Sequence, residues 1–212
     1  MLIRVSRRSL VYSAAALPAL AQLKTTPLQT LGPFYPADRP HDQDADLTVI
    51  KGKKGRAKGE LLYVTGRVLN TKGEPVRGAR IEIWQCNAAG KYNHPADDNK
   101  APLDPNFEGY AVITTGADGS YRFKTVKPGA YPVGKNAWRP PHIHVDVTGR
   151  SSRIISQMYF PNEPLNEKDN IYKETRGIER LVARIVPPGP EAKGTMEPDA
   201  KMALWDIVLN KG

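Results

Sequence analysis

The chain has 212 residues, of which 40% are hydrophobic and 25% are charged, and its formal net charge is +9. This length and composition predict one soluble globular domain with a full hydrophobic core, and they exclude a disordered or low-complexity chain. The basic residues do not indicate nucleic-acid binding. Their one cluster, at residues 51–58, contains no aromatic side chain, and no pattern of a nucleic-acid-binding fold accompanies it.

The N-terminus has the features of an export signal. Arg7 and Arg8 precede an apolar run over residues 10–20, which ends at a small-residue site (ALA, residues 19–21). The run is too short to cross a bilayer as a stable helix, and the arginine pair resembles a twin-arginine signal, although the general export route stays open. We therefore predict that residues 1–21 are cleaved, that the mature protein has no membrane anchor, and that it works in the bacterial periplasm. The alternative is a basic N-terminal helix.

The rest of the chain is expected to be an all-β fold. Residues 22–60 show no sustained hydrophobic period, so we expect an irregular segment that packs on the core. Over residues 61–212, short runs of alternating apolar and polar side chains are separated by turns rich in Gly, Asn and Asp, which predicts an antiparallel β-sandwich or barrel with long irregular loops. The expected strands, of which the first two should pair, are residues 61–69, 79–86, 110–115, 120–126, 141–148, 154–160 and 203–209. A helix is expected only near residues 178–184 or 191–201.

Two histidines are the first candidates for chemistry. His142 and His144 are one residue apart on an expected strand. Because side chains alternate across a strand, both imidazoles lie on one face, where a single metal ion can bind them. The alternative is a pair of histidines that only pack against the core or lie at the surface. His94 is a further candidate ligand by residue type, although its loop suits an exposed histidine equally well.

A tyrosine precedes this pair in a rigid turn. Tyr131 lies in the segment KPGAYP, residues 127–132, where prolines restrict the backbone on both sides of it. Such a turn holds the hydroxyl in a fixed place. Taken alone, however, the residue is explained better by a tyrosine ring that packs at a corner of the sandwich.

Several ordered segments make the chain similar to the intradiol ring-cleavage dioxygenases, and within that family to the branch that acts on protocatechuate. They extend over roughly residues 30 to 210. The matching segments are 32–35 (GPFY), 66–68 (GRV), 81–92 (IEIWQCNAAGKY), 101–107 (APLDPNF), 127–132 (KPGAYP), 138–144 (WRPPHIH) and 155–160 (ISQMYF). So many segments in one order are far more specific than any single motif.

The resemblance implies a metal site and a reaction. It implies that Tyr92, Tyr131, His142 and His144 hold a non-haem Fe(III) ion, and two phenolate ligands suit ferric better than ferrous iron. It further implies that a small aromatic diol binds through both oxygens and that Tyr131 acts as a catalytic base. The ring is then cleaved by O2 between the two hydroxyls, and the product is a cis,cis-muconate.

The same resemblance places two more residues in the substrate pocket. Arg139 is expected to stabilise negative charge on the substrate ring, and the alternative is a surface arginine at a strand edge. Gln157 corresponds to a pocket residue of the family, although a polar residue on an alternating strand needs no special role. Val133 stands where the family usually has an aromatic residue, which leaves the substituent of the diol open.

Assembly and alternative functions are less constrained. Residues 22–60 are too short and irregular for the helical dimerisation segment of the catechol and hydroxyquinol branches, so we expect either a homo-oligomer or a complex with a homologous chain. A non-catalytic β-sandwich subunit should lack at least one of the four ligands, and none is missing. A zinc hydrolase that uses His142, His144 and either His94 or Asp146 explains the histidine pair but leaves both tyrosines without a role.

Overall fold

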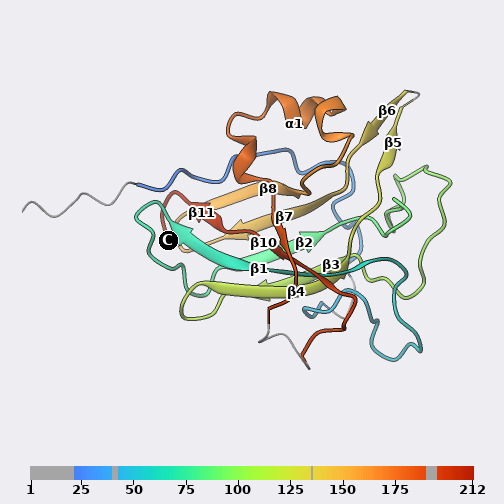
Figure 1. Ribbon diagram of the computed structural model, residues 1–212, viewed down its shortest axis with the longest axis horizontal. Coiled ribbons are helices and arrows are strands. Elements are labelled where there is room, and N and C mark those ends of the chain that lie inside the picture. Colours follow the sequence, from blue (N-terminus) through green and yellow to red (C-terminus); the bar gives the residue numbers. More distant parts are fainter. Residues whose placement is uncertain (1–21, 40–42, 135, 190–194) are drawn as a thin grey trace, which may run out of the picture.

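The computed structural model describes residues 22–39, 43–134, 136–189 and 195–212 (Figure 1). The export signal predicted for residues 1–21 lies outside these ranges and stays a prediction. Of the helix expected at 191–201, residues 191–194 also lie outside them, but residues 195–200 form no helix and residue 201 begins a strand, so a helix over this range is wrong. Among the helices within the described ranges, none is long and apolar enough to cross a membrane.

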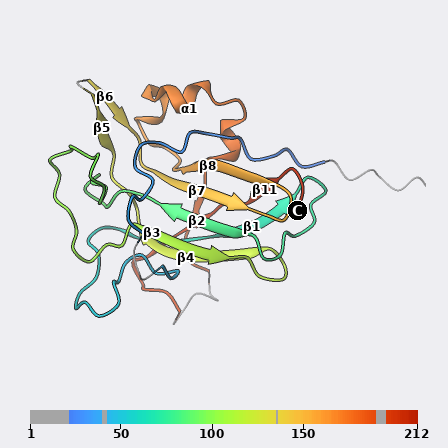
Figure 2. The same ribbon diagram turned by 180° about the vertical axis from the view of Figure 1, so that it is seen from behind.

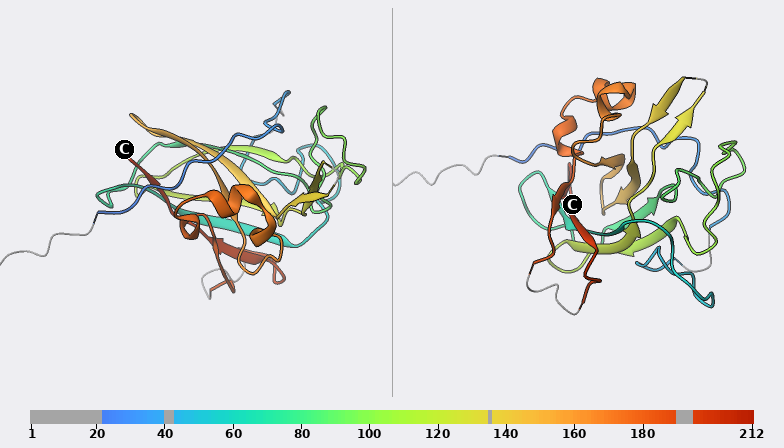
Figure 3. Two further views of the ribbon diagram at one scale, coloured as in Figure 1. Left: turned by 90° about the horizontal axis from the view of Figure 1, so that it is seen from above. Right: turned by 45° about the vertical axis from the view of Figure 1, so that its right-hand side comes forward.

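Two β-sheets pack face to face and form a sandwich (Figures 1 and 3). The first sheet contains β1 (Leu61–Asn70), β4 (Ser120–Val126), β9 (Arg184–Val186), β10 (Lys201–Leu204) and β11 (Ile207–Leu209). The second has the order β3-β2-β7-β8, with β2 at Arg80–Trp84, β3 at Tyr110–Thr114, β7 at His142–Thr148 and β8 at Arg153–Tyr159. A separate hairpin pairs β5 (Tyr131–Val133) with β6 (Ala137–Arg139) and extends beyond one end of the sheets (Figure 2). The predicted all-β sandwich is confirmed.

The pairing of the strands differs from the expectation in two ways. The predicted pair of the first two strands is wrong, because β1 and β2 lie in opposite sheets and bury their apolar side chains against each other across the core. A period of two residues marks a half-buried strand but does not say whether its neighbour in sequence lies beside it or opposite it. In addition, β1 pairs antiparallel with β4 but parallel with β10 and β11, so the first sheet is mixed.

The helical content lies between β8 and β9. It comprises the 3₁₀ helix η1 (Asn166–Lys168), the α-helix α1 (Asn170–Glu174) and the 3₁₀ helix η2 (Ile178–Arg180), so the helix expected at 178–184 is a single 3₁₀ turn. Asp169 caps α1, since its Oδ1 accepts a hydrogen bond of 2.8 Å from the Ile171 amide. Figures 1 and 2 show this segment beside β8, close to the β5–β6 hairpin.

The N-terminal segment runs over the edges of both sheets. The amide of Thr26 donates to Val208 O (3.0 Å) on β11, and the amide of Gln29 donates to Ile155 O (2.9 Å) on β8. The Ser156 hydroxyl donates to Pro27 O (2.7 Å). These bonds carry the chain along β8 toward residues 32–35 at the end of the sandwich where the β5–β6 hairpin lies.

The core is divided into two clusters. The larger fills the space between the sheets with apolar side chains such as Val64, Ile81, Phe123 and Val145. The smaller lies at one end of the sandwich and consists of Trp84, Cys86, Tyr92, Tyr110 and Tyr131. Two of the candidate metal ligands therefore belong to a separate aromatic cluster.

The outer face of β2 carries a buried carboxylate. Glu82 accepts hydrogen bonds of 2.6 Å from the hydroxyls of Tyr35 and Tyr110, and it forms an ion pair with Arg80. Burial by itself raises the pKa of Glu82, but the bonds from Arg80, Tyr110 and Tyr35 outweigh it and lower the pKa to about 2. The cluster ties residue 35 of the N-terminal segment to the second sheet.

We expect the Glu82→Gln variant to be less stable than the wild type at pH 7 by about 1–2 kcal/mol, allowing for solvent screening of the cluster. Because the folded-state pKa lies below the unfolded value, this stabilisation is present above pH 4.5 and is lost as the pH falls from 4.5 toward 2. Urea unfolding at pH 7 and pH 3 measures the difference. The exposed Glu60→Gln is the control, and an equal loss for Glu82→Gln at both pH values would contradict the assignment.

Candidate metal centre

Strand β7 brings the two predicted histidine ligands together. His142 and His144 are both buried, and their Nε2 atoms lie 3.1 Å apart, as the alternation along a strand predicts. Trp84 on the neighbouring strand β2 is in register with His144, and its ring stacks on the imidazole with the centroids 4.8 Å apart. The strand pairing and the stacked Trp84 ring therefore fix the orientation of the His144 imidazole.

Both imidazoles are neutral near pH 7. Burial lowers the pKa of His144 to about 3 and lowers the pKa of His142 well below its usual value, with the nearby Arg139 guanidinium adding to both shifts. His142 Nδ1 lies 2.7 Å from Pro140 O, so this nitrogen carries the proton and donates a hydrogen bond to the carbonyl. The lone pair of His142 then lies on Nε2, the nitrogen that faces His144.

Tyr131 reaches the histidines from the β5–β6 hairpin. Its hydroxyl lies 3.4 Å from His142 Nε2, and its side chain is buried. Burial raises the pKa of the Tyr131 phenol to about 12, so the hydroxyl is protonated at neutral pH in the absence of a cation. The tyrosine that sequence analysis of the turn alone assigned to a packing corner thus faces the histidine pair.

Tyr92 comes from the long loop after β2. Its amide donates to Asp97 Oδ2 (2.7 Å), and its ring packs edge to face on Tyr131, with the centroids 5.4 Å apart. The ring of Phe34, in the N-terminal segment, stacks on the Tyr92 ring with the centroids 4.6 Å apart. The Tyr92 hydroxyl is buried without a hydrogen-bond partner, and burial raises the pKa of this phenol well above 10.

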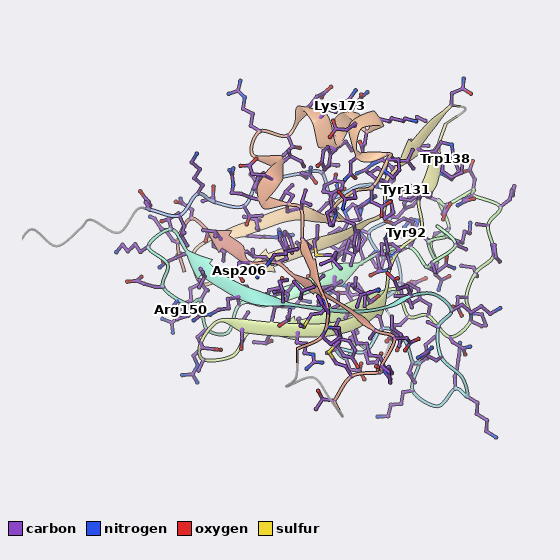
Figure 4. The ribbon with its side chains drawn as sticks, in the orientation of Figure 1. Tyr92, Tyr131, Trp138, Arg150, Lys173 and Asp206 are labelled. Carbon is purple, nitrogen blue, oxygen red and sulfur yellow. The ribbon has the colours of Figure 1, made fainter. Side chains whose placement is uncertain are left out.

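Two glycines allow the loop and the turn that carry these tyrosines to touch. A Cβ atom at Gly90 would lie 2.3 Å from Ala130 O, and one at Gly129 would lie 2.6 Å from Ala88 O. The Gly129 amide also donates to Asn87 O (3.0 Å). Any larger side chain at either position would push the two segments apart, so the contact sets the separation of Tyr92 and Tyr131. Figure 4 shows both tyrosines at the same end of the sandwich.

The four residues fit a ferric ion. They offer imidazole nitrogen and phenol oxygen, and the Tyr92 Oη atom is buried without a partner. A buried polar atom without a partner is destabilising and marks a place where a ligand or ion can bind. Two phenolates neutralise most of the charge of Fe(III), which favours ferric over divalent metals.

The residues of the zinc alternative do not form a metal-binding site. Asp146 is paired with Arg153, whose Nε and Nη2 atoms lie 2.9 Å and 2.5 Å from its two carboxylate oxygens. His94 is half-buried in its loop, and its Nδ1 lies 3.1 Å from the Ala96 amide. In the part of the chain that the structure describes, no group of three His, Cys, Asp or Glu side chains is arranged to hold a metal. The alternative of a zinc site is therefore wrong.

Arg139 and Gln157 are both buried beside the four candidate ligands. Arg139 stands opposite Tyr131 in the β5–β6 hairpin, so the surface alternative for this arginine is wrong. Its Nη2 donates to Gln157 Oε1 (2.6 Å) and to the Tyr159 hydroxyl (3.1 Å). Its Nε donates to Asp169 Oδ2 (2.7 Å).

Three residues around this site, Trp84, Tyr159 and Asp169, were not among the predicted site residues. Trp84 and Tyr159 lie within matching segments, and their position in the segments was the only signal. Asp169 lies outside every matching segment, and only its position before α1 marked it as a helix cap. In addition, Gly32 of the N-terminal segment lies against His144, since a Cβ atom there would be 3.1 Å from its Cε1.

Known proteins resemble this chain over nearly its whole described length. The sequence model of the family described as "Dioxygenase" (Dioxygenase_C) matches residues 30–211. The protocatechuate 3,4-dioxygenase beta chain of Burkholderia cepacia is 49% identical over 183 residues, which are 84% of this chain and 76% of that protein. A hydroxyquinol 1,2-dioxygenase of Rhizobium sp. (strain MTP-10005) is 33% identical over 156 residues, 67% of this chain and 50% of that enzyme.

A solved structure agrees with this assignment. The dioxygenase domain of a dioxygenase and carbohydrate-binding protein fusion from Streptomyces sp. SirexAA-E superposes with a TM-score of 0.66 at 26% identity. The match covers 89% of this chain and all of that domain. The similarity thus extends from the sequence segments to the sandwich itself, and the chain belongs to the intradiol ring-cleavage dioxygenases.

Proposed function

We propose that this chain binds Fe(III) through Tyr92, Tyr131, His142 and His144 and cleaves protocatechuate or a close analogue between its two hydroxyl-bearing carbons. The observation that supports the proposal is the convergence of two neutral imidazoles and two phenols in one buried cluster. The 49% identity to a protocatechuate 3,4-dioxygenase beta chain supports the choice of substrate.

The side chains have separate roles in this proposal. Ferric iron, when bound, would supply a Lewis acid that activates the diol for reaction with O2. The Tyr131 oxygen, a phenolate when iron is bound, would accept one of the two phenolic protons of the substrate on leaving the metal, because the pKa of the phenol without a cation is raised to about 12. Arg139 stays charged and stabilises the negative charge that develops on the ring. Phe34 and Trp84 cover Tyr92 and His144 and keep water away from them.

The reaction conserves all atoms of both substrates. The bond between the two hydroxyl-bearing carbons breaks, O2 is reduced by the four electrons that the diol loses, and each of these carbons becomes a carboxyl carbon. One oxygen atom of O2 enters each carboxyl group of the muconate product.

We expect the iron-loaded protein to convert protocatechuate under ¹⁸O2 into a carboxy-cis,cis-muconate that contains two ¹⁸O atoms. Mass spectrometry of the product measures the incorporation, and catechol and hydroxyquinol are tested in parallel to rank the diols by kcat/KM. A product with one ¹⁸O atom, or cleavage beside the diol rather than between its hydroxyls, would contradict the proposed reaction. Faster turnover of unsubstituted catechol would overturn the choice of substrate.

A second prediction concerns the metal ligands. The iron-loaded protein should show a broad visible band from tyrosinate-to-Fe(III) charge transfer, and anaerobic addition of protocatechuate should shift it. Tyr92→Phe and Tyr131→Phe should each weaken the band at equal iron content, because each removes one phenolate. Tyr63→Phe, which removes a hydroxyl bonded to Glu197 away from the site, should leave it unchanged. A colourless wild-type protein with iron bound would contradict the assignment of the two tyrosines as ligands.

A third prediction follows from the protonation of the metal-free site. Both phenols are protonated at neutral pH, so iron binding must release two protons and the apparent affinity should rise with pH. The slope should be about two decades per pH unit for the wild type and about one for Tyr131→Phe. Competition with a chelator of known affinity at each pH measures both slopes, and equal slopes would show that Tyr131 is not a ligand.

We also propose that the chain assembles with a homologous chain or with copies of itself. The Burkholderia cepacia relative is named as a beta chain, and the β5–β6 hairpin exposes Trp138 and Val133, at 50% and 38% of their surface (Figure 4). An exposed tryptophan on a projecting hairpin is typical of a protein contact.

A further inference from the structure

We propose that Asp169 is a positioning residue that orients the Arg139 guanidinium toward the substrate ring. The inference rests on the proposed function, which gives Arg139 its role at the ring. Asp169 forms no hydrogen bond with the four candidate metal ligands, and its charge is the smallest of the named causes that shift the pKa of Tyr131, so its main effect would pass through Arg139.

Three acceptors hold the guanidinium. Arg139 Nε donates to Asp169 Oδ2 (2.7 Å), while Nη2 donates to Gln157 Oε1 (2.6 Å) and to the Tyr159 hydroxyl (3.1 Å). These acceptors come from two different elements, β8 and the turn before α1. Because the guanidinium is planar, bonds at both Nε and Nη2 fix its plane and its rotation.

Asp169 is the charged residue among these three acceptors of the Arg139 guanidinium. Arg139 and Asp169 are only 7% and 4% exposed, and a buried guanidinium needs a counter-ion close by. Gln157 and Tyr159 are neutral, and each also bonds to the N-terminal segment, Gln157 to Thr30 O and Tyr159 to Gln29. The carboxylate therefore supplies the strongest of the three bonds.

Asp169 is itself held in place through its second oxygen. Oδ1 accepts from the Ile171 amide (2.8 Å) and caps α1, which leaves Oδ2 for Arg139. The Asp169 amide donates to Asn166 O (3.1 Å), and the Asn166 side chain donates to Phe160 O (2.9 Å) at the end of β8. The helical segment thus brings the chain from β8 back to the Arg139 guanidinium, and its hydrogen bonds fix the orientation of the Asp169 carboxylate.

The test separates this role from helix capping. Asn and Ser cap helices about as well as Asp, so Asp169→Asn and Asp169→Ser keep the cap but lose the charged acceptor. In the iron-loaded full chain we expect kcat to fall about 10- to 100-fold, while KM changes less, because misplacement of a group that acts on developing charge affects the transition state most. Glu167→Gln removes an exposed carboxylate from the same segment and should change kcat less than about twofold.

A double variant tests whether Asp169 acts through Arg139. If it does, Asp169→Asn combined with Arg139→Lys should be no slower than Arg139→Lys alone, because the loss of the partner has already removed the oriented guanidinium. Losses that multiply in the double variant would overturn the proposal.

Hydrogen exchange supplies a readout that needs no iron. In the metal-free protein, ¹⁵N NMR should show slow exchange of the Arg139 Nε proton, and Asp169→Asn should speed it at least about tenfold while backbone exchange in β7 stays unchanged. Unchanged exchange of this proton would overturn the proposal. A wild type that turns over no diol would contradict the proposed function instead, and the exchange rates would still decide whether Asp169 orients the guanidinium.

Discussion

The contact between the loop that carries Tyr92 and the turn that carries Tyr131 is the constraint on which the rest of the site depends. It exists because Gly90 and Gly129 have no Cβ atoms, and it places two phenols edge to face in a buried cluster. Burying polar atoms without partners costs about 1–3 kcal/mol for each atom. The metal-free protein bears this cost at the Tyr92 hydroxyl, and metal binding would recover it, so binding and stability are linked.

The sandwich supplies the rigidity that this contact needs. The histidines lie on β7, an inner strand that pairs on one side with β2 and on the other with β8, so their direction is set by two sets of ladder bonds. Trp84 then stacks on His144 from β2, and Gly32 approaches the same imidazole from the N-terminal segment. The tyrosines, by contrast, lie on loop and hairpin residues and depend on side-chain and glycine contacts for their positions.

The histidines lie on a strand, while the tyrosines lie on a loop and a hairpin. This difference decides which of them could be predicted from the sequence. The period of two residues indicated the strands and placed His142 and His144 on one face, because alternation is a property of every strand. It could not show that β1 and β2 lie in opposite sheets, since both partners bury the same kind of side chain. Tyr92 sits in a loop without any period, so only the resemblance to a family pointed to it. Asp169 precedes a helix of five residues, too short to show an apolar face.

The helical segment between β8 and β9 also helps to hold the β5–β6 hairpin in place. The β5–β6 hairpin pairs only three residues on each side, and Tyr131 and Arg139 form the pair at its base. A hairpin this short is marginally stable on its own. The bonds of Arg139 to β8 and to Asp169 tie its base to the sandwich, and since Tyr131 is the cross-strand partner of Arg139, the same bonds hold the phenol near His142. One buried arginine thus connects the candidate metal ligands to the residues around the proposed substrate position.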